Sequence, residues 1–197
     1  MKLPAPQELR AMGQSYHFFM EMQRISQAAA SGDTKALDLL EKMLAECNLG
    51  ADWSANNCWC SATIRAVISS GSERGRKATI AYIESLKEDI PYGALELISS
   101  LLPLYGNSIA PELRRWFALP DNEPPKLIAV QTLCNLYLER QMQGELLDFF
   151  LKAIADYNPR HSLTMHLVDL VRSQSGFSGG ADKVDMEEFM KDVIVER

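Results

Sequence analysis

Apolar residues recur every three or four positions along most of this chain, which is the spacing of one face of an α-helix. The clearest example covers residues 34–47 and follows Asp33, a residue type that often caps the start of a helix. One face of this segment carries Leu37, Leu40, Met43, Leu44 and Cys47. Sustained alternation with a period of two, which would indicate strands, is hard to find. The pattern therefore predicts an all-α protein.

Similar stripes predict about ten helices. They cover roughly residues 7–30, 34–47, 54–70, 72–90, 92–105, 111–119, 125–139, a stretch after Gly144, a stretch from Pro159, and 185–196. The connections are mostly short, so neighbouring helices should pack antiparallel as hairpins. We therefore expect either an irregular right-handed, α-solenoid-like stack of helical hairpins or a compact helical globule.

The chain length fits one domain or one continuous helical array, because a domain usually has ~100–200 residues. We expect a helical-hairpin domain over residues 1–174. A Gly- and Ser-rich segment over 175–184 has the composition of a flexible loop. It should lead into an acidic C-terminal helix over 185–197 that belongs to the same domain.

From about Ser54 onward the expected helices fall into rough pairs of thirty to forty residues. This rhythm resembles that of HEAT, armadillo and tetratricopeptide repeats. The resemblance concerns spacing alone, since the tetratricopeptide signature is missing and the pairs do not align with one another. It implies stacked hairpins with a long concave face suited to binding other proteins.

The composition narrows the class of partner and the compartment. Hydrophobic residues make up 47% of the chain, charged residues 23%, and the net charge is -6. This acidity argues against nucleic acid as the main partner, because binding to phosphates needs a concentrated basic surface. No apolar run resembles a signal peptide or a membrane span, so we expect a cytoplasmic protein with no membrane contact. The four cysteines do not suggest a secreted disulfide framework, so we expect reduced thiols.

The stretch NNCWCSATIR places Cys58 and Cys60 two residues apart. Metal and redox pairs usually have the spacing Cys-x-x-Cys. On a helix with ~3.6 residues per turn, Cys58 and Cys60 point about 200° apart and cannot share one ion. After Cys60, apolar residues occupy nearly every face of the expected helix. This predicts a buried central helix with both cysteines in the core. The two cysteines could ligate a metal only if this segment were not helical, so we expect no metal and no cofactor; a redox or catalytic thiol is the other alternative to core packing.

Two short segments are candidate binding sites. Arg114, Arg115, Trp116 and Phe117 combine residue types that dominate protein interfaces when they are exposed together. The alternative is that the two aromatic side chains cap the core. Arg74, Arg76 and Lys77 form a basic cluster that could contact an anion, with a solvated turn as the alternative.

No sequence motif of a known catalytic class appears, so we nominate no catalytic residue. One hypothesis is nevertheless an enzyme on a helical scaffold that uses His166, Asp169 and carboxylates from other helices. His166 lies on an apolar stripe, and we expect it to be half-buried with a polar partner. Another hypothesis is a helical-repeat nucleic-acid binder that uses Arg65 together with the basic cluster.

The hypothesis we favour is a non-catalytic protein–protein interaction module whose partner is another protein. Such a module would act as an adaptor, an escort or an inhibitor, for example a bacterial toxin-immunity protein. The absence of a catalytic motif, the acidity and the expected stack of hairpins motivate it.

Overall fold

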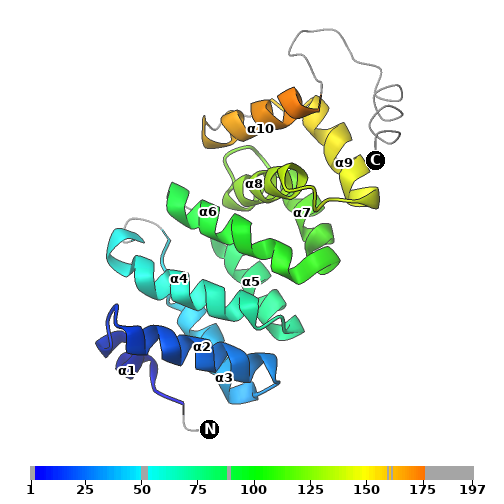
Figure 1. Ribbon diagram of the computed structural model, residues 1–197. Coiled ribbons are helices and arrows are strands. Elements are labelled where there is room, and N and C mark those ends of the chain that lie inside the picture. Colours follow the sequence, from blue (N-terminus) through cyan, green and yellow to red (C-terminus); the bar gives the residue numbers. More distant parts are fainter. Residues whose placement is uncertain (1–2, 50–52, 88–89, 159, 161, 176–197) are drawn as a thin grey trace. The chain divides into compact units, whose positions relative to one another are not determined.

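The computed structural model describes residues 3–49, 53–87, 90–158, 160 and 162–175. All regular elements in these ranges are helices (Figure 1). In chain order they are α1 (Pro6–Ala11), α2 (Tyr16–Ala30), α3 (Thr34–Ala45), α4 (Trp53–Ser69), α5 (Glu73–Ser85), α6 (Tyr92–Leu101), the 3₁₀ helix η1 (Leu102–Ile109), α7 (Ala110–Phe117), α8 (Pro124–Leu138), α9 (Gly144–Ala155) and α10 (Ser162–Gln174). The predicted all-α class is confirmed.

The chain groups into two compact units, Met1–Thr132 and Leu133–Arg197, each described here by itself. The single domain predicted over 1–174 stays a prediction. The C-terminal helix predicted over 185–197 lies outside the described residues. So does the loop predicted over 175–184, apart from Ser175.

Helices α2, α3 and α4 of the first unit each contact the next helix in the chain and the helix after it. Helix α2 packs against α3 and α4, while α3 also packs against α5. Helix α4 packs against α5 and α6, and α6 continues into η1 and α7. Figure 1 shows α2, α4 and α6 following one another, and α4 contacts α2, α3, α5, α6 and η1. Helix α4 is therefore the central helix of this unit.

The burial of α4 matches the prediction from NNCWCSATIR. Between Trp59 and Ser70 most side chains are buried, and only Arg65 and Ser69 are exposed. Cys60 is fully buried, whereas Cys58 on another side of the helix is partly exposed. The prediction of a buried central helix is confirmed for residues 59–70, whereas the prediction that Cys58 lies in the core is wrong.

Side-chain caps fix where several helices begin. The Ser15 hydroxyl accepts a hydrogen bond from the Phe18 amide at 3.2 Å, and Asp33 accepts one from the Lys35 amide at 2.9 Å. Ser72 caps α5 in the same way. The apolar face predicted for α3 is buried along its whole length, namely at Leu37, Leu40, Met43, Leu44 and Cys47.

Two predicted features of the helices are wrong. The single helix expected over 7–30 is two helices, because the backbone at Gly13 adopts a φ of 59° that ends α1. In the helix predicted over 125–139, the polar residue Gln131 lies between the apolar positions, and this spacing predicts that it faces water; it is 3% exposed. Helix α8 is buried on every side from Pro124 to Cys134, so its polar positions do not mark a solvent face.

The second unit is held by apolar packing between α9 and α10 and by Arg172. Its guanidinium donates hydrogen bonds to the carbonyl oxygens of Ile154 (2.9 Å) and Tyr157. These carbonyls lie at the end of α9, where a helix leaves acceptors without partners. The ring centroids of Tyr137 and Phe150 are 5.8 Å apart, and the Tyr137 hydroxyl accepts a hydrogen bond from Ser175 at 2.8 Å.

None of the helices in the described ranges combines the length and the apolar character that crossing a bilayer requires.

We predict that Gly75→Ala lowers the free energy of unfolding. A methyl group at this buried position would lie 2.8 Å from the Ser70 hydroxyl and 3.0 Å from the Val67 carbonyl oxygen. Overpacking of this kind costs about 1–3 kcal/mol and outweighs the gain of about 1 kcal/mol in helix propensity. Urea unfolding measures the change. A more stable variant would show that propensity dominates and that α4 and α5 are not in close contact here.

Candidate functional site

An open groove lies between α2 and α4 in the first unit. Its volume is about 420 Å³. It is lined by Phe19, Met22, Gln23, Ser26, Gln27 and Ala30 from α2 and by Ala62, Arg65, Ala66 and Ser69 from α4. The two helices lie side by side in Figure 1, and their packing is among the most extensive in the unit.

Small residues form the floor of the groove. Ser26, Ala62 and Ala66 are buried, and the Ser26 hydroxyl donates a hydrogen bond to the Ala66 carbonyl oxygen at 3.0 Å. Larger side chains at these positions would separate the helices and fill the space between them. The groove therefore exists because small residues from both helices meet at its floor.

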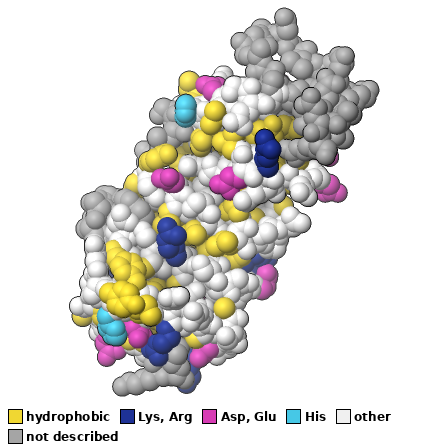
Figure 2. Space-filling model, in the orientation of Figure 1, with side chains coloured by type: hydrophobic (Ala, Val, Ile, Leu, Met, Phe, Trp, Pro, Cys, Tyr) yellow, Lys and Arg dark blue, Asp and Glu magenta, His cyan; other side chains and the backbone are white. Residues whose placement is uncertain are grey.

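Aromatic and apolar side chains project from the N-terminal half of α2. Phe19 lines the groove and is 49% exposed, and Tyr16 and Met20 on the same helix are also exposed. The Phe19 ring packs edge-on against Phe18, with centroids 5.4 Å apart, and Phe18 stacks on Trp59. Figure 2 shows hydrophobic side chains gathered over this part of the molecule, at the lower left. The rim thus offers exposed apolar surface on a rigid aromatic base.

Arg65 is the only charged residue in the lining of the groove. It is exposed, and within the described residues its side chain makes no hydrogen bond or ion pair. Several other cations of this unit do have carboxylate partners. Arg10 pairs with Glu46 at 3.1 Å and Arg24 with Glu21 at 2.6 Å. The groove therefore combines apolar surface with one unpaired positive charge.

The two aromatic residues of the protein-binding site predicted on α7 are not exposed. Trp116 is fully buried and Phe117 is 8% exposed, because both lie on the inner face of α7. The Trp116 indole donates a hydrogen bond to Glu84 at 3.0 Å, and Arg115 forms an ion pair with the same carboxylate. The alternative, that the aromatic side chains cap the core, describes what the structure contains. A binding role for Arg114 and Arg115 stays a prediction.

The cations of the predicted anion contact are held by carboxylates of the chain itself. Arg74 lies 2.6 Å from both Asp38 and Glu41, whose hydrogen bonds raise its pKa above the usual value. Lys77 lies 3.6 Å from Glu73. An anion would have to compete with these internal partners, so nothing sets this cluster apart as a site. The anion contact itself stays a prediction.

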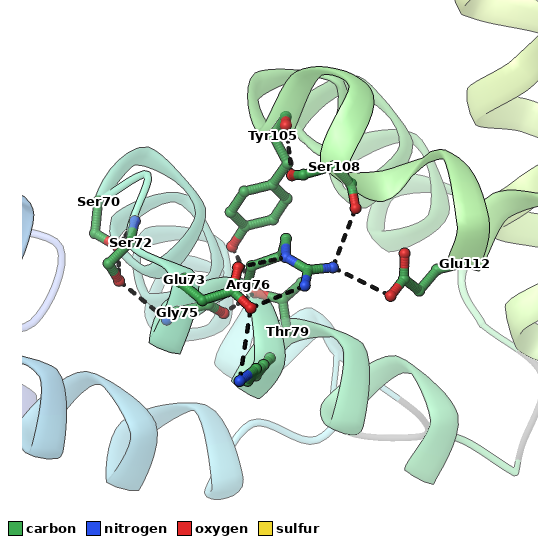
Figure 3. A network of polar contacts seen from close by, with 10 residues as sticks. Ser70, Ser72, Glu73, Gly75, Arg76, Thr79, Tyr105, Ser108 and Glu112 are labelled. Atoms are coloured by element: carbon green, nitrogen blue, oxygen red, sulfur yellow. Dashed lines mark hydrogen bonds and ion pairs between the residues drawn. The ribbon is translucent and has the colours of Figure 1, made fainter. Parts of the chain in front are cut away.

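Arg76 is the centre of the polar network drawn in Figure 3. Its guanidinium lies 2.9 Å from Glu73 and 3.1 Å from Glu112, and it donates a hydrogen bond to the Ser108 carbonyl oxygen. These contacts join α5 to η1, which contains Ser108, and to α7, which contains Glu112. Arg76 thus has a structural role within the first unit.

The histidines give the enzyme hypothesis no enclosed site. Both described histidines, His17 and His166, are exposed, and so is Asp169. The expectation that His166 is half-buried is therefore wrong: it lies on the outer side of α10, whereas Val168 and Val171 of that helix are buried. In the described part of the chain, no three His, Cys, Asp or Glu side chains gather as a metal site.

Sequence reasoning did not find the groove. The sequence places Arg65 only in a possible basic surface, and it predicts no role for the small residues after Cys60 beyond packing in a buried helix. The two residues that meet at the floor, Ser26 and Ala66, are 40 positions apart. No local pattern in the sequence signals that pairing.

We predict that Trp116→Ala lowers the free energy of unfolding by about 3–5 kcal/mol, as expected for truncating a fully buried aromatic side chain. Arg115→Ala should change it by less than about 1 kcal/mol, because the side chain of Arg115 is 57% exposed. Urea unfolding of both variants measures the difference. Equal stability of the two variants would contradict the placement of Trp116 in the core.

The groove between α2 and α4 thus joins a floor of small residues, an exposed aromatic rim and one unpaired cation. Such a surface suits a ligand that buries apolar side chains and carries a negative charge. Comparison of the chain with protein families, curated proteins and solved structures gave no match.

Proposed function

We propose that this protein is a non-catalytic protein-binding module that holds an amphipathic helix of another protein in the groove between α2 and α4. The observation that carries the proposal is the open apolar groove with Arg65 unpaired in its lining. Binding of a helix in a groove between two helices is a common mode of recognition, in which the helix inserts apolar residues spaced i, i+3, i+4 and i+7.

The shape of the groove favours a helix that carries short and medium apolar side chains. Buried small residues such as Ala62 and Ala66 let the backbone of a partner approach closely. Phe19 at the rim offers an aromatic surface that is already exposed and is braced by Phe18. A rigid, exposed aromatic side chain beside a pocket is typical of binding hot spots.

The charge in the groove defines the partner further. Covering Arg65 without a counter-charge would remove it from water at a cost in free energy. A carboxylate on the partner helix offsets that cost and fixes the register of the helix. The partner is therefore an amphipathic helix with an Asp or Glu beside its apolar stripe.

The arrangement of the first unit supports a binding role. Contacts between α2 and α4, between α3 and α5, and between α4 and α6 are those of hairpins stacked in sequence. We propose that these hairpins form a short, irregular α-solenoid, a class that presents elongated surfaces to partner proteins. The role includes an adaptor, an escort or an inhibitor such as a toxin-immunity protein. We also propose a cytoplasmic location, where thiols are normally reduced.

Photo-crosslinking tests where a partner binds. A crosslinking amino acid at Gln23, in the groove, is compared with one at Lys35, an exposed position on α3. In native cell extract the Gln23 probe should capture a partner through a segment with helical apolar spacing and an acidic residue. Capture of the same partner from Lys35 alone would place the interface elsewhere and contradict the proposal.

We predict that Phe19→Ala weakens binding of the captured partner about tenfold, or about 1.4 kcal/mol, because it removes an exposed anchor. Leu104→Ala is the matched control, since Leu104 is exposed on η1 outside the groove. Isothermal titration measures both affinities. Equal losses in the two variants would show that general apolar exposure, and not the groove, determines binding.

We predict that Arg65→Glu weakens binding by roughly tenfold or more, because it sets a like charge opposite the partner's carboxylate. Lys35→Glu makes the same change in net charge outside the groove and should leave affinity nearly unchanged. Exchanging the partner's acidic residue for Arg should restore binding to Arg65→Glu. Failure of this exchange would refute the pairing even if the groove binds the helix.

A further inference from the structure

The rim of the groove between α2 and α4 leaves large apolar side chains in water. Tyr16 is 79% exposed, Phe19 49% and Met20 44%. Single exposed apolar residues are ordinary, but three on one helix beside an open groove mark a surface that binds another segment. Arg65 adds an exposed, unpaired positive charge to the lining. A segment that covers this surface must therefore supply apolar side chains together with a negative charge.

The helix predicted over 185–197, which lies outside the described residues, has both properties in its sequence, DMEEFMKDVIVER. Four apolar residues have the spacing i, i+3, i+4 and i+7, which places them on one face of a helix: Met186, Phe189, Met190 and Val193. At about 100° per residue, three acidic residues border this apolar stripe on one side: Asp185, Asp192 and Glu196. The sequence of this segment therefore has the chemistry that the groove requires.

The stripe also matches the groove in length. From Met186 to Val193 it covers eight residues, or about 12 Å on a helix with a rise of ~1.5 Å per residue. The residues of α4 that line the groove, from Ala62 to Ser69, cover eight residues as well. Methionine side chains are unbranched and adapt to irregular spaces, which suits an open groove with a floor of small residues.

We propose that the groove between α2 and α4 binds residues 185–197 of a second copy of this chain, folded as a helix. The apolar stripe covers the floor and the rim, where Phe189 packs against Phe19, and a carboxylate of the acidic border pairs with Arg65. This inference rests on the proposed function of the groove as a site for an acidic amphipathic helix. Two copies that exchange these segments form a closed, twofold-symmetric dimer.

A second copy supplies the segment because the chain limits the reach of its own copy. Ten residues, 175–184, separate the segment from α10 and span at most about 35 Å when fully extended. A second copy has no such limit. The exchanged segment and the helix of another protein use the same contacts in the groove. Binding of another protein therefore separates the two copies.

Photo-crosslinking of the purified full chain, with no extract present, tests the proposal. Chains with the crosslinking amino acid at Gln23 are mixed in urea with chains labelled with nitrogen-15 and are refolded together. After illumination and digestion, the light peptide that contains position 23 should be joined to heavy peptides from residues 185–197. A probe at Lys35 should give no such product. Joining to light peptides alone would show binding within one chain and would overturn the proposal, as would the absence of any product from residues 185–197.

Two variants of the segment test the apolar stripe. Phe189→Ala should weaken self-association about tenfold, because it removes the largest side chain of the stripe. Val195→Ala is the matched control, since Val195 lies on the opposite face of the predicted helix and should leave self-association unchanged. Analytical ultracentrifugation of the full-length variants measures both dissociation constants. Equal dissociation constants of the two variants would refute the role of the stripe.

Failure of this inference is distinguishable from failure of the proposed function, because the purified chain contains no other protein. A Gln23 probe that captures an acidic helix of another protein from extract, but no residues 185–197 from the purified chain, would refute self-binding. The groove would then remain a helix-binding site.

Discussion

Helix α4 must bury most of its surface, because it packs against α2, α3, α5, α6 and η1 at once. A helix in that position can carry few polar side chains, and those it carries must point to the remaining open side. This constraint explains why small residues face α2, why Gly75 of α5 lies close to the Val67 carbonyl, and why Cys60 is in the core. The groove is a consequence of where α4 lies.

The sequence predicts those features that each helix determines by itself, such as its buried face and its N-terminal cap. The buried face of α3 and the buried course of α4 follow from apolar spacing, and the cap at Asp33 follows from residue type. The prediction from the sequence fails where burial or the end of a helix depends on more than the apolar spacing within that helix. Spacing predicts that Gln131 faces solvent, yet the residues of α8 around it are all buried and it is 3% exposed. Gly13 ends α1 through a positive φ, and the periodicity on either side conceals that break.

The candidate site depends on pairs of residues that are distant in sequence. Ser26 and Ala66 meet at the floor of the groove. Cysteine spacing along the chain drew attention to Cys58 with Cys60, while the hydrogen-bond partner of the Cys60 thiol is the carbonyl oxygen of Asn48. Trp116 shows the opposite error, since residue type suggested a surface anchor and the fold placed it in the core. Composition alone cannot distinguish the two environments.

Arg65 determines which helices the groove excludes as well as which it accepts. Its side chain lies along an apolar wall, and its charge stays in water while the groove is open. A purely apolar or basic helix would cover or oppose this charge, and either costs free energy that burial of a short apolar stripe does not offset. The carboxylate of an acidic helix offsets this cost by pairing with Arg65. In a protein with a net charge of -6, most acidic partners are repelled at long range. Selectivity therefore depends on close contact at Arg65 and on apolar fit, and it requires both in the same helix.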